Sequence, residues 1–147
     1  MIKIVCVFLM LYCSAFGQLK VNYYKIQNKY GSSIEENTFS QKKIIKDSET
    51  AVFLFSKVDS LLLGVSFTKP NAYTEAQFEE LKTEYVENFK PSKTKSWENL
   101  LVYFDEKRNI MIIKFFEDTI QRKIIGITFM TDSKEISGFL SLFENSH

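Results

Sequence analysis

The side chains that most often do chemistry in proteins are scarce in this sequence. Its only histidine is His147, the last residue, and its two cysteines, Cys6 and Cys13, both lie near the N-terminus. A zinc site of the cysteine and histidine type needs at least three such ligands, and a nucleophilic serine or cysteine needs a neighbouring base, most often histidine. The glycines stand alone rather than in a phosphate-binding loop. We therefore predict no catalytic residue, no metal site and no cofactor, although a serine–lysine pair stays open.

Paired carboxylates offer the remaining route to catalysis. Two acidic pairs, 105–106 and 117–118, flank the apolar segment 110–116. In a strand of this length, with about 3.3 Å per residue, the two pairs lie roughly 20 Å apart. Glycosidase carboxylates lie about 5 to 9.5 Å apart. The pairs are therefore predicted to belong to two separate solvated loops.

A basic segment with one aromatic residue follows the middle of the chain. Lys90, Lys93 and Lys95 precede Trp97, the only tryptophan. Lysines beside an aromatic ring can bind single-stranded nucleic acid, but the segment before them is acidic, so we interpret 91–98 as a solubilising loop and expect no nucleic-acid partner. Trp97 is either a residue at the edge of the core or an anchor for a protein partner, because tryptophan is enriched at binding hot spots. It is our candidate partner contact.

The first residues have the pattern of a secretory signal peptide. Lys3 supplies a positive charge, an apolar run covers Ile4 to Tyr12, and Ala15 and Gly17 are small residues at the −3 and −1 positions. The run is shorter than the roughly 20 residues that span a bilayer. We predict a signal peptide over 1–17, cleaved between Gly17 and Gln18. An uncleaved anchor, a lipoprotein site and a buried strand are the alternatives.

Composition predicts one globular domain over 18–147 without a further membrane span. The chain is 45% hydrophobic and 15% aromatic, which argues against disorder. Removing Lys3 with the signal peptide leaves 18 basic and 18 acidic residues, so no strong field for nucleic acid or anionic lipid is expected. It also removes both cysteines, and a domain of this size can rely on its hydrophobic core alone. We expect an exported protein, periplasmic or extracellular.

Alternation and capping residues predict the order of the elements. We expect a strand over 20–31, a loop or irregular edge segment over 32–46, and a hairpin over 51–69 that turns at Asp59-Ser60. On the return strand, Leu61, Leu63, Val65 and Phe67 are expected to share one face. Thr74 and Gln77 form a capping box, which predicts a helix that ends at Pro91.

The second half is predicted to hold three strands and a closing helix. The strands cover 100–104, 110–116 and 121–131, and the first two enclose a five-residue hairpin loop. Asp132 with Glu135 predicts a helix start, and the apolar residues that follow recur at helical spacing. Runs of strands with segregated helices favour the α+β class. We expect an antiparallel sheet of about five or six strands packed against two helices, on one face or on both.

Three segments resemble the PsbP-like group, which includes PsbP and DcrB-type envelope proteins. They are "NKYGSSIEENTF" at 28–39, "GVSFTK" with "YTEAQFEELKTEYVENFK" at 64–69 and 73–90, and "KIIGITFMTDSKEISGFLSLFENS" at 123–146. The resemblance lies in the order of elements, and a proline-tryptophan pair of the group is missing near 36–39. It implies an antiparallel sheet between helices and a binding or accessory role without catalysis.

Together these observations favour an exported, non-catalytic accessory or protein-binding domain of the bacterial cell envelope. The first alternative is a secreted inhibitor or immunity protein, which a clustered, exposed acidic or aromatic patch would favour. The second is a carboxylate-dependent hydrolase, which requires two acids within about 10 Å in one cleft.

Overall fold

The computed structural model describes residues 19, 21–31, 34–37 and 41–144. Within these ranges the chain forms three helices and eight strands. Their order is α2 (Tyr23–Tyr30), β1 (Ile34–Asn37), β2 (Gln41–Lys46), β3 (Glu49–Phe55), β4 (Leu62–Tyr73), α3 (Glu75–Tyr85), β5 (Lys93–Trp97), β6 (Leu100–Asp105), β7 (Ile110–Phe116), β8 (Ile124–Met130) and α4 (Ser133–Glu144).

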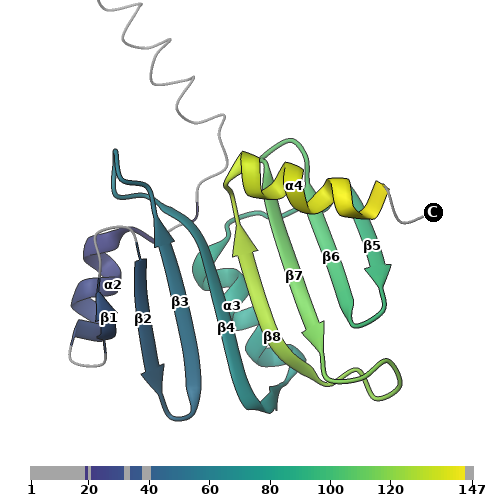
Figure 1. Ribbon diagram of the computed structural model, residues 1–147, viewed down its shortest axis with the longest axis horizontal. Helices are drawn as coiled ribbons and strands as arrows, with labels where there is room; N and C mark the ends of the chain where they lie inside the picture. Colours follow the sequence, from purple (N-terminus) through teal and green to yellow (C-terminus); the bar gives the residue numbers. More distant parts are fainter. Residues whose placement is uncertain (1–18, 20, 32–33, 38–40, 145–147) are drawn as a thin grey trace, which may run out of the picture.

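The eight strands form one antiparallel sheet in the order β1-β2-β3-β4-β8-β7-β6-β5. The first four strands and the last four are each a meander, and the meanders meet where β4 pairs with β8. Helix α3 carries the chain behind the sheet to its far edge (Figure 1). The predicted α+β class is thereby confirmed. The sheet is wider than expected, because the polar strands β1, β2 and β5 carry little apolar alternation.

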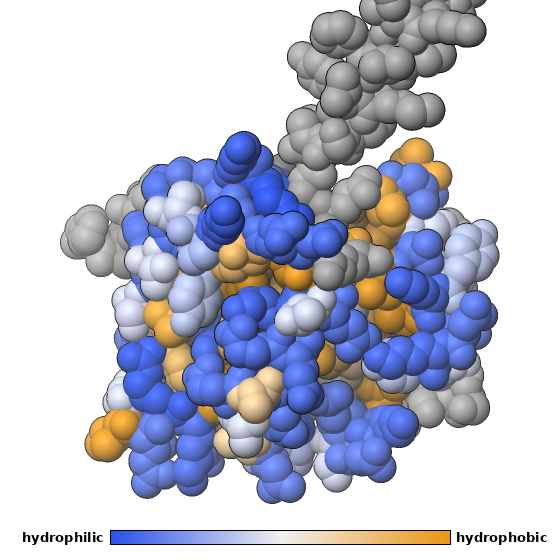
Figure 2. All heavy atoms as spheres, turned by 180° about the vertical axis from the view of Figure 1, so that it is seen from behind, coloured by the Kyte–Doolittle hydropathy of each residue, from blue (hydrophilic) through white to orange (hydrophobic). Residues whose placement is uncertain are grey.

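The helices cover both faces of the sheet. Ile26 of α2 and Phe78 and Tyr85 of α3 belong to the larger core cluster on one face, and Ile136 of α4 belongs to a second cluster on the other. Figure 1 shows α4 crossing β7, β6 and β5, while β2, β3 and β4 carry no helix on that side. Seen from the α3 side, the surface is mostly hydrophilic (Figure 2). Half of the α4 face is therefore open.

Helix α3 begins where its capping residues predict. Thr74 Oγ1 accepts from the Gln77 backbone N–H, and Gln77 Oε1 accepts from the Thr74 N–H, so both halves of the capping box are formed. The helix ends at Tyr85 rather than near Pro91, because Val86 is extended and buried. Burial of that side chain ends the helix one and a half turns before the proline.

The predicted hairpin is confirmed as β3 and β4, but the residues of β4 that point into the core are partly different from those expected. Phe53 pairs with Val65, whereas a register shift makes Phe55 pair with Leu62. Leu62 is therefore buried, and Leu61 and Leu63, which were expected to share a face with Val65, are only half-buried. A bulge of this kind cannot be read from alternation, because it changes the side to which the residues beyond it point.

The prediction of a strand over 20–31 is wrong. Residues 23–30 form α2, whose N-cap Asn22 accepts from the Lys25 backbone N–H. Tyr23, Ile26 and Tyr30 recur at helical spacing and pack against the core. Tertiary packing of this stripe overrides the strand preference of tyrosine and isoleucine.

Two lysine-rich segments also differ from expectation. Residues 41–46 form β2, which lies between β1 and β3 and is therefore not an edge strand. Lys42, on this strand, is fully buried. Its ammonium donates to Gln27 Oε1 and lies 4.1 Å from the centre of the Tyr23 ring, so it ties α2 to the sheet. The predicted basic loop at 91–98 contains the strand β5.

Candidate binding surfaces

Strand β5 lies at one edge of the sheet in the described part of the chain. It pairs with β6, and no other strand in the described part of the chain pairs with it. All five of its residues are exposed. An edge strand presents unpaired backbone N–H and C=O groups, on which an extended segment of another protein can add a strand.

Trp97 lies at the end of this edge strand and is 38% exposed. It pairs with Leu100, which pairs with Phe115. Directly opposite residues point to the same side of a sheet, so these three side chains form an apolar row on the α4 side. Trp97 is therefore placed where a partner along β5 can reach it.

An ion pair and a hydrogen bond connect β5 and the residue before it to the turn that follows β6. Lys93 Nζ lies 2.5 Å from Glu106 Oε1, and the Ser92 hydroxyl donates to Glu106 Oε2 at 3.2 Å. The hydrogen bond from Lys93, with its positive charge, lowers the pKa of the Glu106 carboxyl. Lys93 and Lys95 both lie on this edge strand, and the charge of Lys93 is paired with that of Glu106.

The two acidic pairs lie at opposite ends of β7, as predicted. Asp105 pairs with Ile110 at the start of the strand, and Glu117 follows its last residue. The Asp105 carboxylate accepts from the backbone N–H groups of Lys90 and Arg108, at 3.3 and 3.2 Å. These contacts hold a turn.

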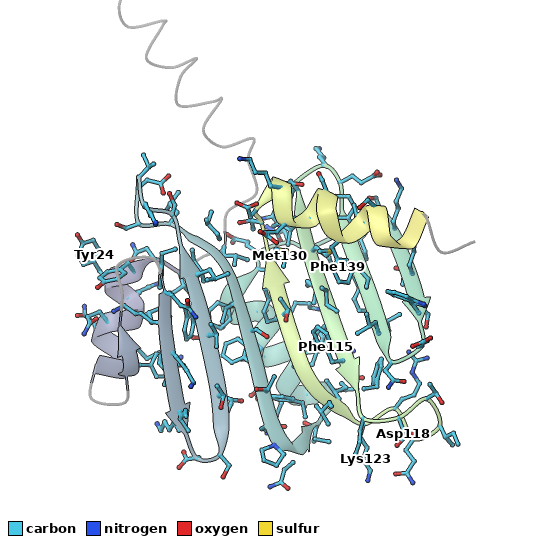
Figure 3. The ribbon with its side chains drawn as sticks, in the orientation of Figure 1. Tyr24, Phe115, Asp118, Lys123, Met130 and Phe139 are labelled. Carbon is cyan, nitrogen blue, oxygen red and sulfur yellow. The ribbon has the colours of Figure 1, made fainter. Side chains whose placement is uncertain are left out.

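The pair at the other end of β7 also shapes a turn. Asp118 Oδ1 accepts from the backbone N–H groups of Ile120 and Gln121, and these hydrogen bonds lower the pKa of Asp118. Glu117 is exposed, with its carboxylate 3.9 Å from Lys123 Nζ. Figure 3 shows Asp118 and Lys123 together at this end of the molecule.

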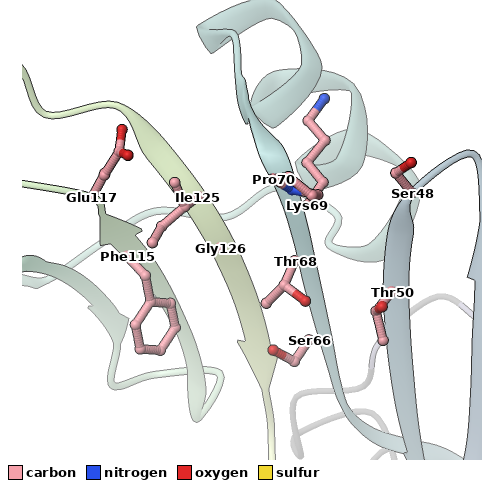
Figure 4. Close-up of a pocket in the computed structure, with 10 residues that line it drawn as sticks. All are labelled: Ser48, Thr50, Ser66, Thr68, Lys69, Pro70, Phe115, Glu117, Ile125 and Gly126. Atoms are coloured by element: carbon pink, nitrogen blue, oxygen red, sulfur yellow. The ribbon is translucent and has the colours of Figure 1, made fainter.

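The open half of the α4 face holds a groove of about 620 Å³ (Figure 4). Hydroxyl side chains from β4, β3 and the turn before β3 line one part of it, Phe115 of β7 lines another, and Glu117 also lines it. The hydroxyl residues are Ser48, Thr50, Ser66 and Thr68. This groove was not predicted from the sequence. Its signal was the alternation of hydroxyl residues with buried ones in β3 and β4.

A second groove of about 290 Å³ lies where α4 begins. Val52, Leu54 and Met130 form its apolar part, and Asp132 and Glu135 also line it. These two acids share one groove, as the hydrolase alternative requires. Asp132 Oδ1, however, accepts from the backbone N–H groups of Lys134 and Glu135 and caps α4. Its carboxylate is used to start the helix.

The remaining predictions concern metals, membranes and the N-terminus. Among the described residues, no three histidine, cysteine, aspartate or glutamate side chains lie close enough to hold a metal ion. None of the three helices described is long and apolar enough to cross a membrane. The predicted cleavage site at Gly17 and Gln18 and the terminal His147 lie outside the described residues.

Comparison with known proteins found only distant structural likeness. No protein-family model and no curated protein matches the sequence. A DUF4309 family protein (YjgB) from Bacillus subtilis is 9% identical with a TM-score of 0.41, covering 77% of this chain and 80% of that one. A cysteine-rich secretory protein (SAV1118) from Staphylococcus aureus is 11% identical with a TM-score of 0.36, covering 82% of this chain and 50% of that one. We infer no function from these two likenesses.

Proposed function

We propose that this protein is an exported, non-catalytic binding domain of the bacterial cell envelope, which holds an extended acidic segment of a partner protein along the edge strand β5. The observation that carries this proposal is the edge strand itself, with five exposed residues and Trp97 at its end. Main-chain hydrogen bonds would supply affinity, and side-chain contacts would supply specificity.

The charges at this edge support an acidic partner. Lysines on an edge strand discourage indiscriminate strand pairing, and Lys93 and Lys95 both lie on β5. An acidic strand would be attracted to the same side chains. Trp97 would then contribute the apolar contact that fixes the register of the added strand.

Export is supported by the signal-peptide pattern of the first residues. The packed core begins directly after the predicted cleavage site, with Leu19 and Val21 buried. The non-catalytic role is supported by the carboxylates of Asp105, Asp118 and Asp132, which accept backbone hydrogen bonds in turns and a helix cap. Because no family model matches, the PsbP-like resemblance stays a hypothesis.

Affinity capture tests this function. Tagged protein covering residues 18–147 is incubated with envelope and medium fractions of the native cells, and stoichiometric partners are identified. We expect one partner retained by the native sequence and lost with Trp97→Ala and with Lys95→Glu. In the complex, hydrogen exchange should slow at those backbone amides of 93–97 that point away from β6, because an added strand would bond to them.

Tyr24→Ala is the matched control. Tyr24 is 67% exposed on α2, at the opposite end of the sheet from β5 (Figure 3). This variant should retain the partner. A partner that binds all three variants equally, or binds without slowing exchange at 93–97, would contradict the assignment of this edge.

One observation favours the inhibitor alternative. The exposed side of α3 carries Glu79, Glu80 and Glu84 around a shallow hollow, with Glu79 paired to Lys82 and Glu84 to Lys29. An acidic helix face of this kind could occupy a basic enzyme cleft. Under that function, Glu80→Lys would abolish capture and Trp97→Ala would not, so the same experiment separates the two candidates.

A further inference from the structure

The groove of about 620 Å³ lies outside the surface used by the proposed function. It spans β3, β4, β8 and β7, whereas the proposed partner binds at β5. Its size is within the range of about 300 to 1,000 Å³ that is usual for small-molecule sites.

One part of the groove is a set of hydroxyl groups on adjacent strands. Thr50 pairs directly with Thr68, and Ser66 lies one step along the same face of β4. Thr128 donates its hydroxyl hydrogen to Ser66 Oγ at 2.9 Å, which leaves Ser66 its own hydrogen to donate. Each hydroxyl can both donate and accept, so the set matches a ligand that carries several hydroxyl groups.

The other part is an aromatic surface beside these hydroxyls. Phe115 pairs with Gly126, and a Cβ at Gly126 would lie 3.3 Å from Phe115 Cδ2. The absent side chain leaves room for the Phe115 ring beside the glycine. Thr68 pairs with the same glycine from the other side. Strands are about 4.8 Å apart, so the backbones that carry Thr68 and Phe115 are about 10 Å apart. The residue between them, Gly126, has no side chain.

The charges at the groove favour a neutral ligand. Lys69 is the only lysine among the described residues that line it, and its ammonium donates to Gln77 Oε1 at 3.0 Å and lies 4.2 Å from the centre of the Tyr73 ring. Figure 4 shows this side chain directed away from the hydroxyls. Glu117 lies near Lys123. A phosphate or carboxylate would find no directed cation here, whereas a neutral hydroxyl group could donate to Glu117.

The geometry points to a neutral saccharide as the ligand of this groove. One face of its ring lies against Phe115, and its hydroxyl groups exchange hydrogen bonds with Ser66, Thr68 and Glu117. Sugars combine an apolar ring face with a hydroxyl edge, and the groove places an aromatic ring beside hydroxyls in the same way. The protein would thus hold a glycan here and a protein partner at β5.

Saturation-transfer NMR on the purified protein tests this inference. The probes are three neutral tetrasaccharides, maltotetraose, cellotetraose and chitotetraose, with a sulfated heparin tetrasaccharide as the charged comparison. We expect transfer to the ring hydrogens of at least one neutral probe and none to the sulfated one. Thr68→Val should weaken binding about fivefold, the effect of one lost hydrogen bond.

Two further variants keep the result interpretable. Thr83→Val is the matched control, because Thr83 lies on α3 and does not line the groove. Trp97→Ala should leave saccharide binding unchanged, so failure of the proposed β5 function leaves this inference intact. Absence of transfer to all neutral probes, or equal binding by Thr68→Val, would overturn it. Loss of the captured protein partner in Thr68→Val would assign the groove to that partner instead.

Discussion

The ammonium group of Lys114 lies 2.8 Å from the Glu75 carboxylate, and the two residues differ sharply in exposure. The Lys114 side chain is 5% exposed on β7, whereas Glu75, in the first turn of α3, is 71% exposed. Lys114 also lies 3.8 Å from the centre of the Phe78 ring. A buried charge is costly unless it is paired. Helix α3 therefore covers Lys114 and also supplies the carboxylate of Glu75 and the ring of Phe78 that contact its ammonium group.

Glu75→Ala should destabilise the fold, because it leaves the buried ammonium without its carboxylate. We expect a loss of about 1 to 3 kcal/mol in the free energy of unfolding, measured with urea. The exposure of Glu75 keeps the value below that of a fully buried pair. Lys114→Met, which removes the buried charge and keeps the apolar stem, should cost less than Glu75→Ala.

The double variant separates the effect of the Lys114–Glu75 ion pair from the effect of placing an acid at the N-terminus of α3. In the Lys114→Met background, Glu75→Ala should cost only the few tenths of a kcal/mol of an acid near a helix N-terminus. Glu80→Ala, an exposed acid on the same helix, is the control and should change stability by less than about 0.5 kcal/mol. Additive effects of the two pair variants would contradict the coupling.

Thr74→Ala should destabilise α3 through loss of its capping box. Thr74 Oγ1 satisfies the Gln77 N–H, and removing an N-cap hydroxyl typically costs about 1 kcal/mol. Urea unfolding followed by circular dichroism measures the change. Thr83→Ala removes a threonine within the same helix and should be neutral or slightly stabilising, because alanine favours the helix. Equal losses for both would show that the cap contributes little.

Local signals in the sequence were sufficient for the start of α3, because the capping box at Thr74 depends on neighbours within a few residues. The stop expected at Pro91 and the tight turn expected at Asp59-Ser60 are not found: α3 ends at Tyr85, and a longer loop over 56–61 joins β3 to β4. The separation of Asp105 from Glu117 followed from strand length alone. The capping box and this separation need no knowledge of what packs against them.

The wrong and missing predictions concern segments whose structure is determined by tertiary contacts. The segment 23–30 has strand-favouring tyrosines, and only the core contact of Ile26 shows why it is helical. β5 has no apolar alternation, so its pairing with β6 could not be seen. The groove depends on strands that are distant in sequence, since Thr68 meets Gly126 only through the pairing of β4 with β8. Trp97 was singled out by residue type, but its neighbours were not.

Tyr73→Phe should reveal a pH-dependent contribution to stability. The Tyr73 hydroxyl donates to Glu49 Oε2 at 2.7 Å, and burial together with this hydrogen bond raises the pKa of Tyr73 well above its usual range. The contribution is complete below the unfolded-state pKa of about 10. Above it the unfolded chain loses its proton while the folded state keeps it, so stability falls by up to about 1.4 kcal/mol per pH unit.

Phenylalanine cannot titrate, so the variant lacks this pH dependence of the free energy of unfolding. At neutral pH Tyr73→Phe should be less stable than the native protein by about 1 to 2 kcal/mol, through loss of the hydrogen bond. The difference should narrow between about pH 10 and pH 11. Denaturant unfolding at each pH measures it. Tyr24→Phe, at an exposed position, should match the native protein throughout, and a constant difference for Tyr73→Phe would contradict the account.

Two glycine-to-alanine substitutions should have opposite effects. At Gly138 in α4 a Cβ would meet nothing within 4 Å, so Gly138→Ala should stabilise the helix by about 0.5 to 1 kcal/mol. At Gly126 a Cβ would lie 3.3 Å from Phe115 Cδ2 and 3.5 Å from the Phe67 carbonyl oxygen. Gly126→Ala should therefore cost about 1 to 3 kcal/mol, because the ring must move.

The same substitution tests the groove that Phe115 lines. If the Phe115 ring beside Gly126 forms the saccharide platform, Gly126→Ala should weaken binding of the neutral tetrasaccharide at a temperature where the variant remains folded. Gly138→Ala should bind as the native protein does, because none of the α4 side chains that the structure describes lines this groove. Thermal unfolding and saturation transfer on the same samples separate lost stability from lost binding. A destabilised Gly126→Ala with undiminished binding would show that the ligand does not depend on the position of the ring.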